Sequence, residues 1–440
     1  MVEQRVEQQV QNWGNYPVLA AAGVTAPAAF EGLALALGPG APLIARGNGR
    51  CYGDAALQRR IVSTLRWNKV LGFDREQGIF ECEAGVLLAD VLALVVPHGF
   101  FLPVTPGTKY VTVGGAVAAN VHGKNHHHAG AFGRYVEALE VLTETGEQVP
   151  CSRTQHPELF RQTIGGMGLT GIIVAVRFRL SRLETAYLHT ARHPAANLAE
   201  VLALLDAHRA QPYLVAWLDG LRRGPEAGRG IVHTGRPAAL AELGAAERAA
   251  PLRPHGGRQL GLPGYLPRHT LNRYTIGLYN AWYYRQNRRP PPGLTHYDDF
   301  FYPLDKLRDW NRLYGRPGFV QYQLVLPPAA AAAGLAEVLA AVHAAGCSAL
   351  LAVLKVLGAA DAWAAPISFP MEGHSLALDF RVTPAVLALL DRLDAIVLHH
   401  GGRLYLAKDA RMPAEVFARS YPAFAHPAAF QSLQSQRLGI

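Results

Sequence analysis

Three glycine-rich segments in the first half of the chain hold the residue types best suited to chemistry. The first is RGNGRCYGD at residues 46–54, which directly follows an apolar run typical of a strand. Such a segment leaves successive backbone N–H groups free to point one way, which is a common way of holding a pyrophosphate. Three glycines after a strand also form ordinary turns, so this segment alone leaves both interpretations open.

The second segment, VTPGTKYVTVGGAVAANVHGKNHHH at residues 104–128, is more specific. Gly114 and Gly115 open a run of small residues that predicts a helix whose backbone a ligand can approach closely. Thr108, Thr112 and Asn120 offer short polar groups that suit the edge of a heteroaromatic ring. The alternative is a Gly/Ala helix packed tightly against a sheet.

The third segment, GGMGLTGII at residues 165–173, is a glycine-rich turn that enters a predicted strand. Three such turns in one half of a chain are more than turn formation needs. Together they predict a long cofactor that crosses a sheet and is held mostly by backbone groups.

The histidines of the second segment raise the question of a metal. His122 and His126 are four residues apart, a spacing that metal ligands have on a helix. Gly123 weakens a helix there, and no third ligand stands at a useful distance, so we expect no metal. Consecutive side chains at residues 126–128 cannot share one face of a helix or strand, and we expect them to make backbone and cofactor-edge contacts in a loop.

The elements that must position these residues follow from hydrophobic periodicity. Strands are predicted at 42–45, 61–64, 79–83, 136–143, 213–218, 318–325, 349–356 and 375–381, and helices at 87–96, 195–210, 237–250, 329–345 and 385–399. Residues 251–300 are rich in Pro, Gly, Arg and aromatic residues, and their composition predicts a mobile loop.

Composition narrows the class of protein. The chain has 440 residues, of which 50% are hydrophobic and 17% charged, as in globular proteins of two or three domains or one two-lobed unit. The net charge of +9 reflects either a coding bias toward arginine or a basic surface for phosphates or anionic lipids. No basic block with interleaved aromatics suggests nucleic acid, and the four cysteines have no paired spacing. With neither an apolar signal core nor a run of about 20 apolar residues, we expect a cytoplasmic protein.

These motifs resemble the FAD domain of flavoproteins of the vanillyl-alcohol-oxidase type. The resemblance narrows, within that family, to the flavin subunits of the epimerases that convert ribose to arabinose. It extends over nearly the whole chain, because further segments agree: WGN at 13–15, AWLD at 216–219, YPLD at 302–305, WNR at 310–312, QYQ at 321–323, LKV at 354–356 and YLAKD at 405–409. HGKNHH and QYQ are the specific motifs, whereas the glycine turns are shared by the wider superfamily.

The resemblance implies a two-domain α+β fold. The FAD-binding domain takes residues 1–190, a substrate domain built on an antiparallel sheet with helices on one side takes 191–401, and 402–440 return to the FAD-binding domain. Arg50 stands where many members tether FAD through a histidine, so the FAD is expected to be non-covalent. The implied cofactor contacts are Arg46, Gly47, Asn48, Gly49, Arg50, Cys51, Tyr52, Thr108, Gly114, Gly115, Ala118, Asn120, His122, Gly123, Asn125, His126, Gly168, Ile172, Ile173 and Tyr405.

The resemblance also implies the site of oxidation. Lys408, on a predicted apolar strand, would accept the carbinol proton or hold the hydroxyl, and His122 and Tyr52 would assist. The glutamines of QYQ share one face of a strand, which lines a sugar pocket unless it is an exposed sheet face. Ala377 stands where the resembled enzymes have a cysteine that reacts with inhibitors. The implied substrate contacts are Lys124, Trp217, Tyr302, Gln321, Gln323, Lys355, Ala377 and Lys408.

The function that the resemblance implies is FAD-dependent oxidation of the 2-hydroxyl of a polyprenyl-phospho-ribose to the 2-keto sugar. This is the first half of an epimerisation to arabinose in cell-wall biosynthesis, and an NADH-dependent short-chain reductase would complete it. Related flavin oxidases act on soluble sugars, alditols or natural-product alcohols, which is the alternative. A flavin-binding protein without turnover is a third class, against which Lys408 and the two glutamines argue.

Segment 251–300 suggests peripheral contact with a membrane. Aromatic residues beside arginines suit a membrane–water interface, although an ordinary loop would have a similar composition. The residues concerned are Leu260, Leu262, Tyr265, Leu266, Trp282, Tyr283 and Tyr284, together with Arg258, Arg268, Arg273, Arg285, Arg288 and Arg289.

Overall fold

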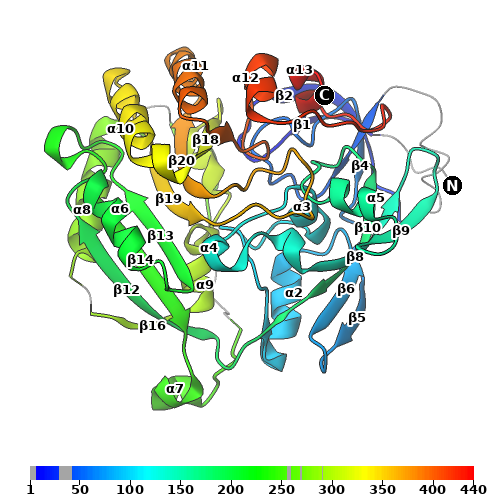
Figure 1. The fold of residues 1–440 in the computed structure, drawn as a ribbon, viewed down its shortest axis with the longest axis horizontal. Coiled ribbons are helices and arrows are strands. Elements are labelled where there is room, and N and C mark those ends of the chain that lie inside the picture. The colour runs from blue at the N-terminus through cyan, green and yellow to red at the C-terminus, as the bar shows by residue number, and fades with distance from the viewer. Residues whose placement is uncertain (1–5, 29–41, 255–258, 268–269, 290) are drawn as a thin grey trace.

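A computed structural model describes residues 6–28, 42–254, 259–267, 270–289 and 291–440. Arg258 and Arg268 of the predicted interfacial segment lie outside the described residues. The blue and cyan half of the chain lies beside the green and yellow half, and the red C-terminal segment returns to the blue part (Figure 1). The fold is α+β, as predicted.

A small four-stranded sheet carries the first glycine segment. It consists of β1 (Val6–Gln11), β2 (Val18–Thr25), β4 (Arg60–Ser63) and β3 (Leu43–Arg46), in the order β1-β2-β4-β3. β3 and β4 pair in parallel, and the predicted strands at 42–45 and 61–64 are confirmed. Because β3 ends at Arg46, the glycine segment begins as the chain leaves the sheet.

A five-stranded antiparallel sheet supports the second and third glycine segments. Its order is β5-β6-β10-β8-β9, formed by β5 (Val70–Asp74), β6 (Ile79–Glu83), β10 (Ile172–Arg179), β8 (Val136–Leu142) and β9 (Gln148–Ser152). α2 (Leu88–Val95) and α3 (Val113–Ala118) share a core with this sheet. A Cβ at Gly114 would lie 2.7 Å from the Cβ of Ala84, so this glycine lets α3 approach the chain beyond β6 closely.

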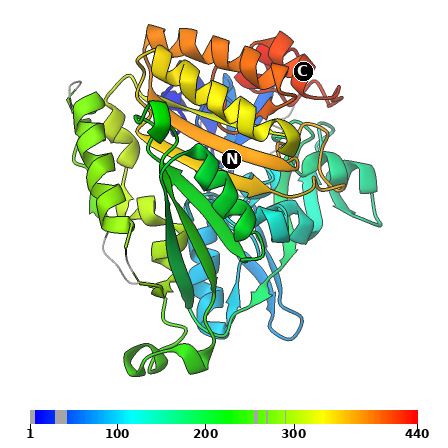
Figure 2. The ribbon, with the colours of Figure 1, turned by 60° about the vertical axis from the view of Figure 1, so that its left-hand side comes forward.

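The third sheet has eight antiparallel strands in the order β16-β12-β14-β13-β19-β20-β18-β21. Its strands are β12 (Tyr187–Ala195), β13 (Tyr213–Leu218), β14 (Gly230–Pro237), β16 (Gly293–His296), β18 (Phe319–Leu326), β19 (Leu351–Leu357), β20 (Gly373–Arg381) and β21 (Arg403–Leu404). Three helices, α6 (Leu198–Ala207), α10 (Pro328–Ala344) and α11 (Pro384–His399), cover one face of it (Figure 2).

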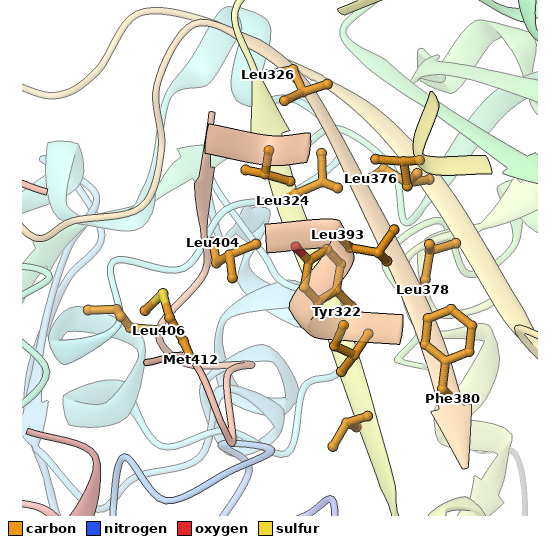
Figure 3. Close-up of a cluster of buried hydrophobic side chains, with 14 of the residues drawn as sticks. Tyr322, Leu324, Leu326, Leu376, Leu378, Phe380, Leu393, Leu404, Leu406 and Met412 are labelled. Atoms are coloured by element: carbon orange, nitrogen blue, oxygen red, sulfur yellow. The ribbon is translucent and has the colours of Figure 1, made fainter. Parts of the chain in front are cut away.

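Strand alternation divides the two faces of this sheet. Figure 3 shows Tyr322 and Leu324 of β18 beside Leu376 and Leu378 of β20, under Leu393 of α11. Successive side chains of a strand point to opposite faces, so the intervening Gln321 and Gln323 face away from the helices. Both glutamines are buried there, which excludes the exposed-sheet alternative.

The C-terminal segment joins the sheets. β21 pairs with β18, and the chain then carries α12 (Ala414–Ser420) and α13 (Leu433–Leu438). The backbone N–H of Tyr52 donates to the carbonyl of Ala407 at 3.0 Å. Arg437 lies within 2.8 Å of both Asp54 and Asp409. The tail therefore bridges the first glycine segment and the eight-stranded sheet.

Two predicted regular elements, the helix at 237–250 and the strand at Lys408, are wrong. Residues 237–250 form only a 3-10 turn at Leu240–Glu242 and the short α7 (Ala245–Arg248), separated by extended backbone at Gly244. Lys408 lies in a turn after β21, where its N–H donates to the carbonyl of Tyr405 at 2.9 Å, and not on a strand.

Segment 251–300 is also more ordered than predicted. It contains α8 (Arg273–Asn287), β16 and α9 (Tyr297–Phe301). The Asn272 side chain caps α8 by accepting from the N–H groups of Tyr274 and Thr275. α8 packs on β12 and β14, and its Tyr283 ring lies 4.6 Å from that of Trp217, on the face opposite α6. The helices of this part are therefore not all on one side of the sheet.

Candidate active site

A cavity of about 630 Å³ lies between the glycine segments and the face of the eight-stranded sheet opposite α6, α10 and α11. Its volume falls in the range of small-molecule and cofactor sites. It brings together most of the predicted residues: Gly47, Asn48, Gly49, Arg50, Cys51, Tyr52, Thr108, Gly114, Gly115, Ala118, His122, Lys124, Gly168, Ile173, Trp217, Gln321, Gln323, Lys355, Ala377, Tyr405 and Lys408.

The first glycine segment presents free backbone donors to this cavity. Residues 48–51 line it, and their N–H groups have no hydrogen-bond acceptor in the described part of the chain. Gly49 has a φ of +61°, a conformation that glycine adopts without strain. Such a row of unpaired N–H groups suits the phosphates of a dinucleotide.

Arg50 is held against an aromatic ring at the same end. Its guanidinium carbon lies 3.9 Å from the ring centroid of Trp13 and 5.6 Å from that of Tyr110. Burial lowers the pKa of Arg50, although Asp305 and Asp309 oppose that effect. The side chain adds a positive charge to this end of the cavity and offers no nucleophile for a covalent tether.

α3 points its first turn at the cavity. Thr112, Gly114 and Gly115 all line it, and the Thr112 side chain caps the helix by accepting from the N–H of Gly115 at 3.2 Å. α3 therefore packs tightly against the sheet and also borders the ligand cavity, as the two interpretations of the sequence predict. Gly114 packs closely on Ala84, while Gly115 borders the cavity.

Three of the six lysines meet in the cavity. Burial lowers the pKa of Lys408 to about 7, an effect that Asp379 opposes and Lys355 reinforces. Burial likewise lowers the pKa of Lys355 to about 8 and that of Lys124 to about 7. A lysine whose pKa lies near neutrality can gain and lose a proton at working pH.

Asp379 lies at the end of a hydrogen-bonded chain that leads to Tyr52. Gln321 donates to one of its oxygens, and Tyr314 donates to the other at 3.4 Å. Gln321 also hydrogen-bonds the Tyr52 side chain, whose ring lies under Lys408. Burial raises the pKa of Asp379 to about 7, against the opposing effects of Gln321 and Lys408.

His122 forms a second polar group of the cavity. The Gln323 amide lies 3.0 Å from its Nε2 and 3.2 Å from the Ser375 hydroxyl. Burial, followed by Lys355 and His126, lowers the pKa of His122 well below its usual range, so the ring is neutral. With Nε2 accepting from Gln323, the ring proton resides on Nδ1, a buried atom with no partner among the described residues. The ring as a whole lines the cavity, while its Nδ1 is buried and has a proton that no described residue accepts.

Seven predicted contact residues lie behind the wall and not on it. The Asn120 side chain joins Ser368 and Gly133, and the His126 ring accepts from the N–H of Gly358 at 3.0 Å. The side chains of Asn120 and His126 thus make hydrogen bonds within the protein, and these two residues support the cavity wall from behind. The seven are Arg46, Asn120, Gly123, Asn125, His126, Ile172 and Tyr302.

The loop predicted for residues 126–128 is instead a short helix, α4 (His126–Ala129). His127 and His128 contact the carbonyls of Gln211 and Arg209 at 3.0 and 2.9 Å. None of these three rings lines the cavity, and their predicted contacts with backbone groups are present, so a contact with the cofactor edge stays a prediction.

Sequence reasoning missed several residues of the site. Asp379 follows Ala377 by two positions in β20, so strand alternation could have placed it on the cavity face. Arg192 and His233 pair across β12 and β14 and line the far end of the cavity with Tyr279 and Tyr283 of α8. No motif indicated these, because they come from strands distant in sequence.

The comparisons with known proteins agree with this geometry. A family model described as "FAD binding domain" matches residues 31–152. The chain is 35% identical over 388 residues to the decaprenylphosphoryl-β-D-ribose oxidase of Mycolicibacterium smegmatis, covering 87% of this chain and 84% of the relative. The chain belongs to this family of FAD-dependent oxidases.

Other relatives cover different shares of the chain. An uncharacterized protein of Streptomyces coelicolor is 34% identical over 77% of this chain and 92% of its own. The L-gulonolactone oxidase of Bos taurus is 32% identical over only 32% of each chain. The protein is accordingly an FAD-dependent oxidoreductase that acts on alcohol groups, and the unpaired N–H groups at residues 48–51 fit the cofactor. No helix in the described ranges has the length and hydropathy needed to cross a membrane.

Proposed function

We propose that this protein oxidises the 2-hydroxyl of a polyprenyl-phospho-ribose to the 2-keto sugar. The observation that carries the proposal is one cavity with two different ends. Unpaired backbone donors suited to FAD line one end, and Lys124, Lys355 and Lys408 lie further along it. The name of the M. smegmatis relative specifies the same class of lipid-linked sugar.

Oxidation of a carbinol removes a hydride from carbon and a proton from oxygen, and the C–O bond becomes a carbonyl. FAD, when bound, supplies the hydride acceptor. Lys408 accepts the hydroxyl proton, because its lowered pKa leaves a large neutral fraction near pH 7. The Tyr52 ring beneath it holds the Nζ in place.

The remaining polar groups orient the sugar. Gln321 and Gln323 lie on the cavity face of β18, where side-chain amides can bond ribose hydroxyls. His122 offers its Nδ1 proton to the same region. Lys124 and Lys355, with Arg192 further out, supply positive charge for the substrate phosphate.

The proposed product requires a second enzyme. A ketone reduced from the opposite face gives arabinose, so an NADH-dependent short-chain reductase acting on this product is the proposed partner. We also propose that the FAD is held without a covalent bond and that the protein works as a peripheral membrane protein on the cytoplasmic side. We propose an FAD-binding part at residues 1–190 and 402–440 and a substrate part at 191–401.

The alternative substrate is a soluble sugar, alditol or natural-product alcohol. The match to L-gulonolactone oxidase favours it, although that match covers only a third of either chain. Anaerobic reduction of the flavin by candidate alcohols distinguishes the two: the lipid-linked ribose should reduce it fastest.

A further inference from the structure

We propose that the outer face of α8 docks the protein onto an anionic membrane, with the mouth of the cavity at the lipid surface. The inference rests on the proposed function in one respect: a lipid-linked substrate gives the docking its purpose. The surface itself is defined by the helix, whose two sides differ in exposure, charge and contacts.

Large apolar side chains line the outer side of α8. Tyr274 is 74% exposed, Leu278 75% and Trp282 55%. They are spaced four residues apart, so they form one stripe along the helix. Contiguous exposed apolar residues of this size are uncommon on a soluble surface unless they meet a partner or a membrane.

Arginines extend the same stripe. Arg285 and Arg289 continue it at the C-terminal end, while Arg273 and Arg288 flank it. Residues 270–289 contain no acidic residue, and none of these four arginines has a carboxylate partner in the described part of the chain. Apolar and aromatic residues beside unpaired arginines complement a bilayer with anionic headgroups.

This charge pattern favours a membrane over a second copy of the chain. A two-fold interface through α8 would set the same arginine-rich stripe against itself. Like charges brought together without counter-charges oppose association. Anionic lipids supply those counter-charges, and the aromatic side chains suit the headgroup level.

The inner side of α8 is part of the cavity. Tyr279, Tyr283 and Asn287 line it, and the Tyr283 hydroxyl lies 3.4 Å from His233. The helix is therefore a thin wall with the substrate cavity on one side and the apolar stripe on the other. A polyprenyl chain leaving the cavity beside α8 would enter the bilayer directly.

Contacts outside the stripe fix α8 to the protein. Asn280 is buried and donates to Asp219 at 2.8 Å, and Ile276 is buried. The outer residues are therefore available for substitution without loss of these anchors. This separation allows docking to be tested apart from folding and catalysis.

The experiment is co-sedimentation of the FAD-loaded protein with vesicles of phosphatidylcholine alone or with phosphatidylserine. Wild type should sediment with the anionic vesicles and much less with the neutral ones. Arg285→Gln with Arg289→Gln should lower the anionic partition coefficient about 30-fold, since two arginines are removed from the surface. Tyr274→Ser with Leu278→Ser should weaken it comparably. The matched control is Val70→Ser with Leu71→Ser, which removes two exposed apolar residues of β5 and should change nothing.

Two further results separate this inference from the proposed function. The α8 variants should keep the flavin spectrum and wild-type flavin reduction by a water-soluble, short-prenyl phospho-ribose. If the protein binds anionic vesicles but oxidises no phospho-ribose, the proposed substrate is wrong and the proposed membrane docking still holds. The docking proposal is contradicted if the wild-type protein does not sediment with anionic vesicles, or if both α8 double variants sediment with them as the wild type does. It is also contradicted if sedimentation equilibrium shows a dimer that the serine variants abolish.

Discussion

The Nζ of Lys408 lies 3.6 Å from the centroid of the Tyr52 ring. That ring is hydrogen-bonded through Gln321 to the buried carboxyl group of Asp379. The lysine therefore sits over an aromatic face, close enough to Asp379 for the two pKa values to influence each other. Burial lowers the pKa of Lys408 to about 7 against the opposing effect of Asp379, so a large fraction of the amine is neutral at pH 7 and can accept a proton.

The first prediction concerns Lys408 as the proton acceptor. Lys408→Met keeps the apolar stem and should leave FAD binding and the flavin spectrum unchanged. Flavin reduction by substrate should fall about 10²–10⁴-fold, the range for loss of a general base. Stopped-flow absorbance under anaerobic conditions measures the rate. Lys306→Met, at an exposed ion pair with Asp299, is the matched control. A colourless or insoluble Lys408 variant would instead indicate a structural lysine.

The second prediction is that two substitutions shift the pH midpoint of the flavin reduction rate in opposite directions. Only neutral Lys408 accepts a proton, so the reduction rate should rise with pH and level off above about 7. Asp379 raises the pKa of Lys408, so Asp379→Asn should move the midpoint to lower pH. Lys355 lowers that pKa, so Lys355→Met should move it to higher pH. Midpoints that shift in the same direction, or not at all, would show that another group titrates.

The third prediction is that FAD is released on denaturation. Arg50 packs on Trp13 and offers no side chain that could form a flavin bond. Precipitation with acid should leave all yellow colour in the supernatant. Flavin retained in the washed pellet would show a covalent link to another residue.

The fourth prediction concerns position 377. Ala377 lines the cavity opposite Gln323 on the neighbouring strand, and the native side chain has no nucleophile. Nitroaromatic inactivators that capture the cysteine of resembled enzymes should bind wild type reversibly, whereas Ala377→Cys should be modified covalently. Peptide mass spectrometry locates the adduct. An adduct on Cys51 of wild type would mean that the reactive face is misplaced.

Much of the fold could be predicted because its signals are local. Alternation or apolar runs located strands such as β6 and β13, and glycines marked the segments that border the cavity. The composition of residues 251–300 predicts a mobile loop, but Asn272 caps the helix α8 there, and aromatic residues lie on the outer side of that helix. Local propensity could not distinguish that helix from an interfacial loop.

The site was only partly predictable for a different reason. Motifs located His122 and Lys408, which lie in recognisable segments. Arg192 and His233 reach the cavity, and Asp379 lies behind its wall against Gln321, only because antiparallel pairing places β12, β14 and β20 in one sheet. Similarly, the sequence predicts Asn120 and His126 as cofactor contacts because it cannot show that they hydrogen-bond Ser368 and Gly358.

The substrate is tested most directly by anaerobic flavin reduction with three alcohols at equal concentration: a short prenyl-phospho-ribose, free ribose and xylitol. The cavity lysines and Arg192 predict that the prenyl-phospho-ribose bleaches the flavin much faster than the other two and yields the 2-keto sugar, identified by mass spectrometry after borodeuteride trapping. Equal or faster bleaching by ribose or xylitol would contradict the account and assign the protein to the oxidases of soluble alcohols.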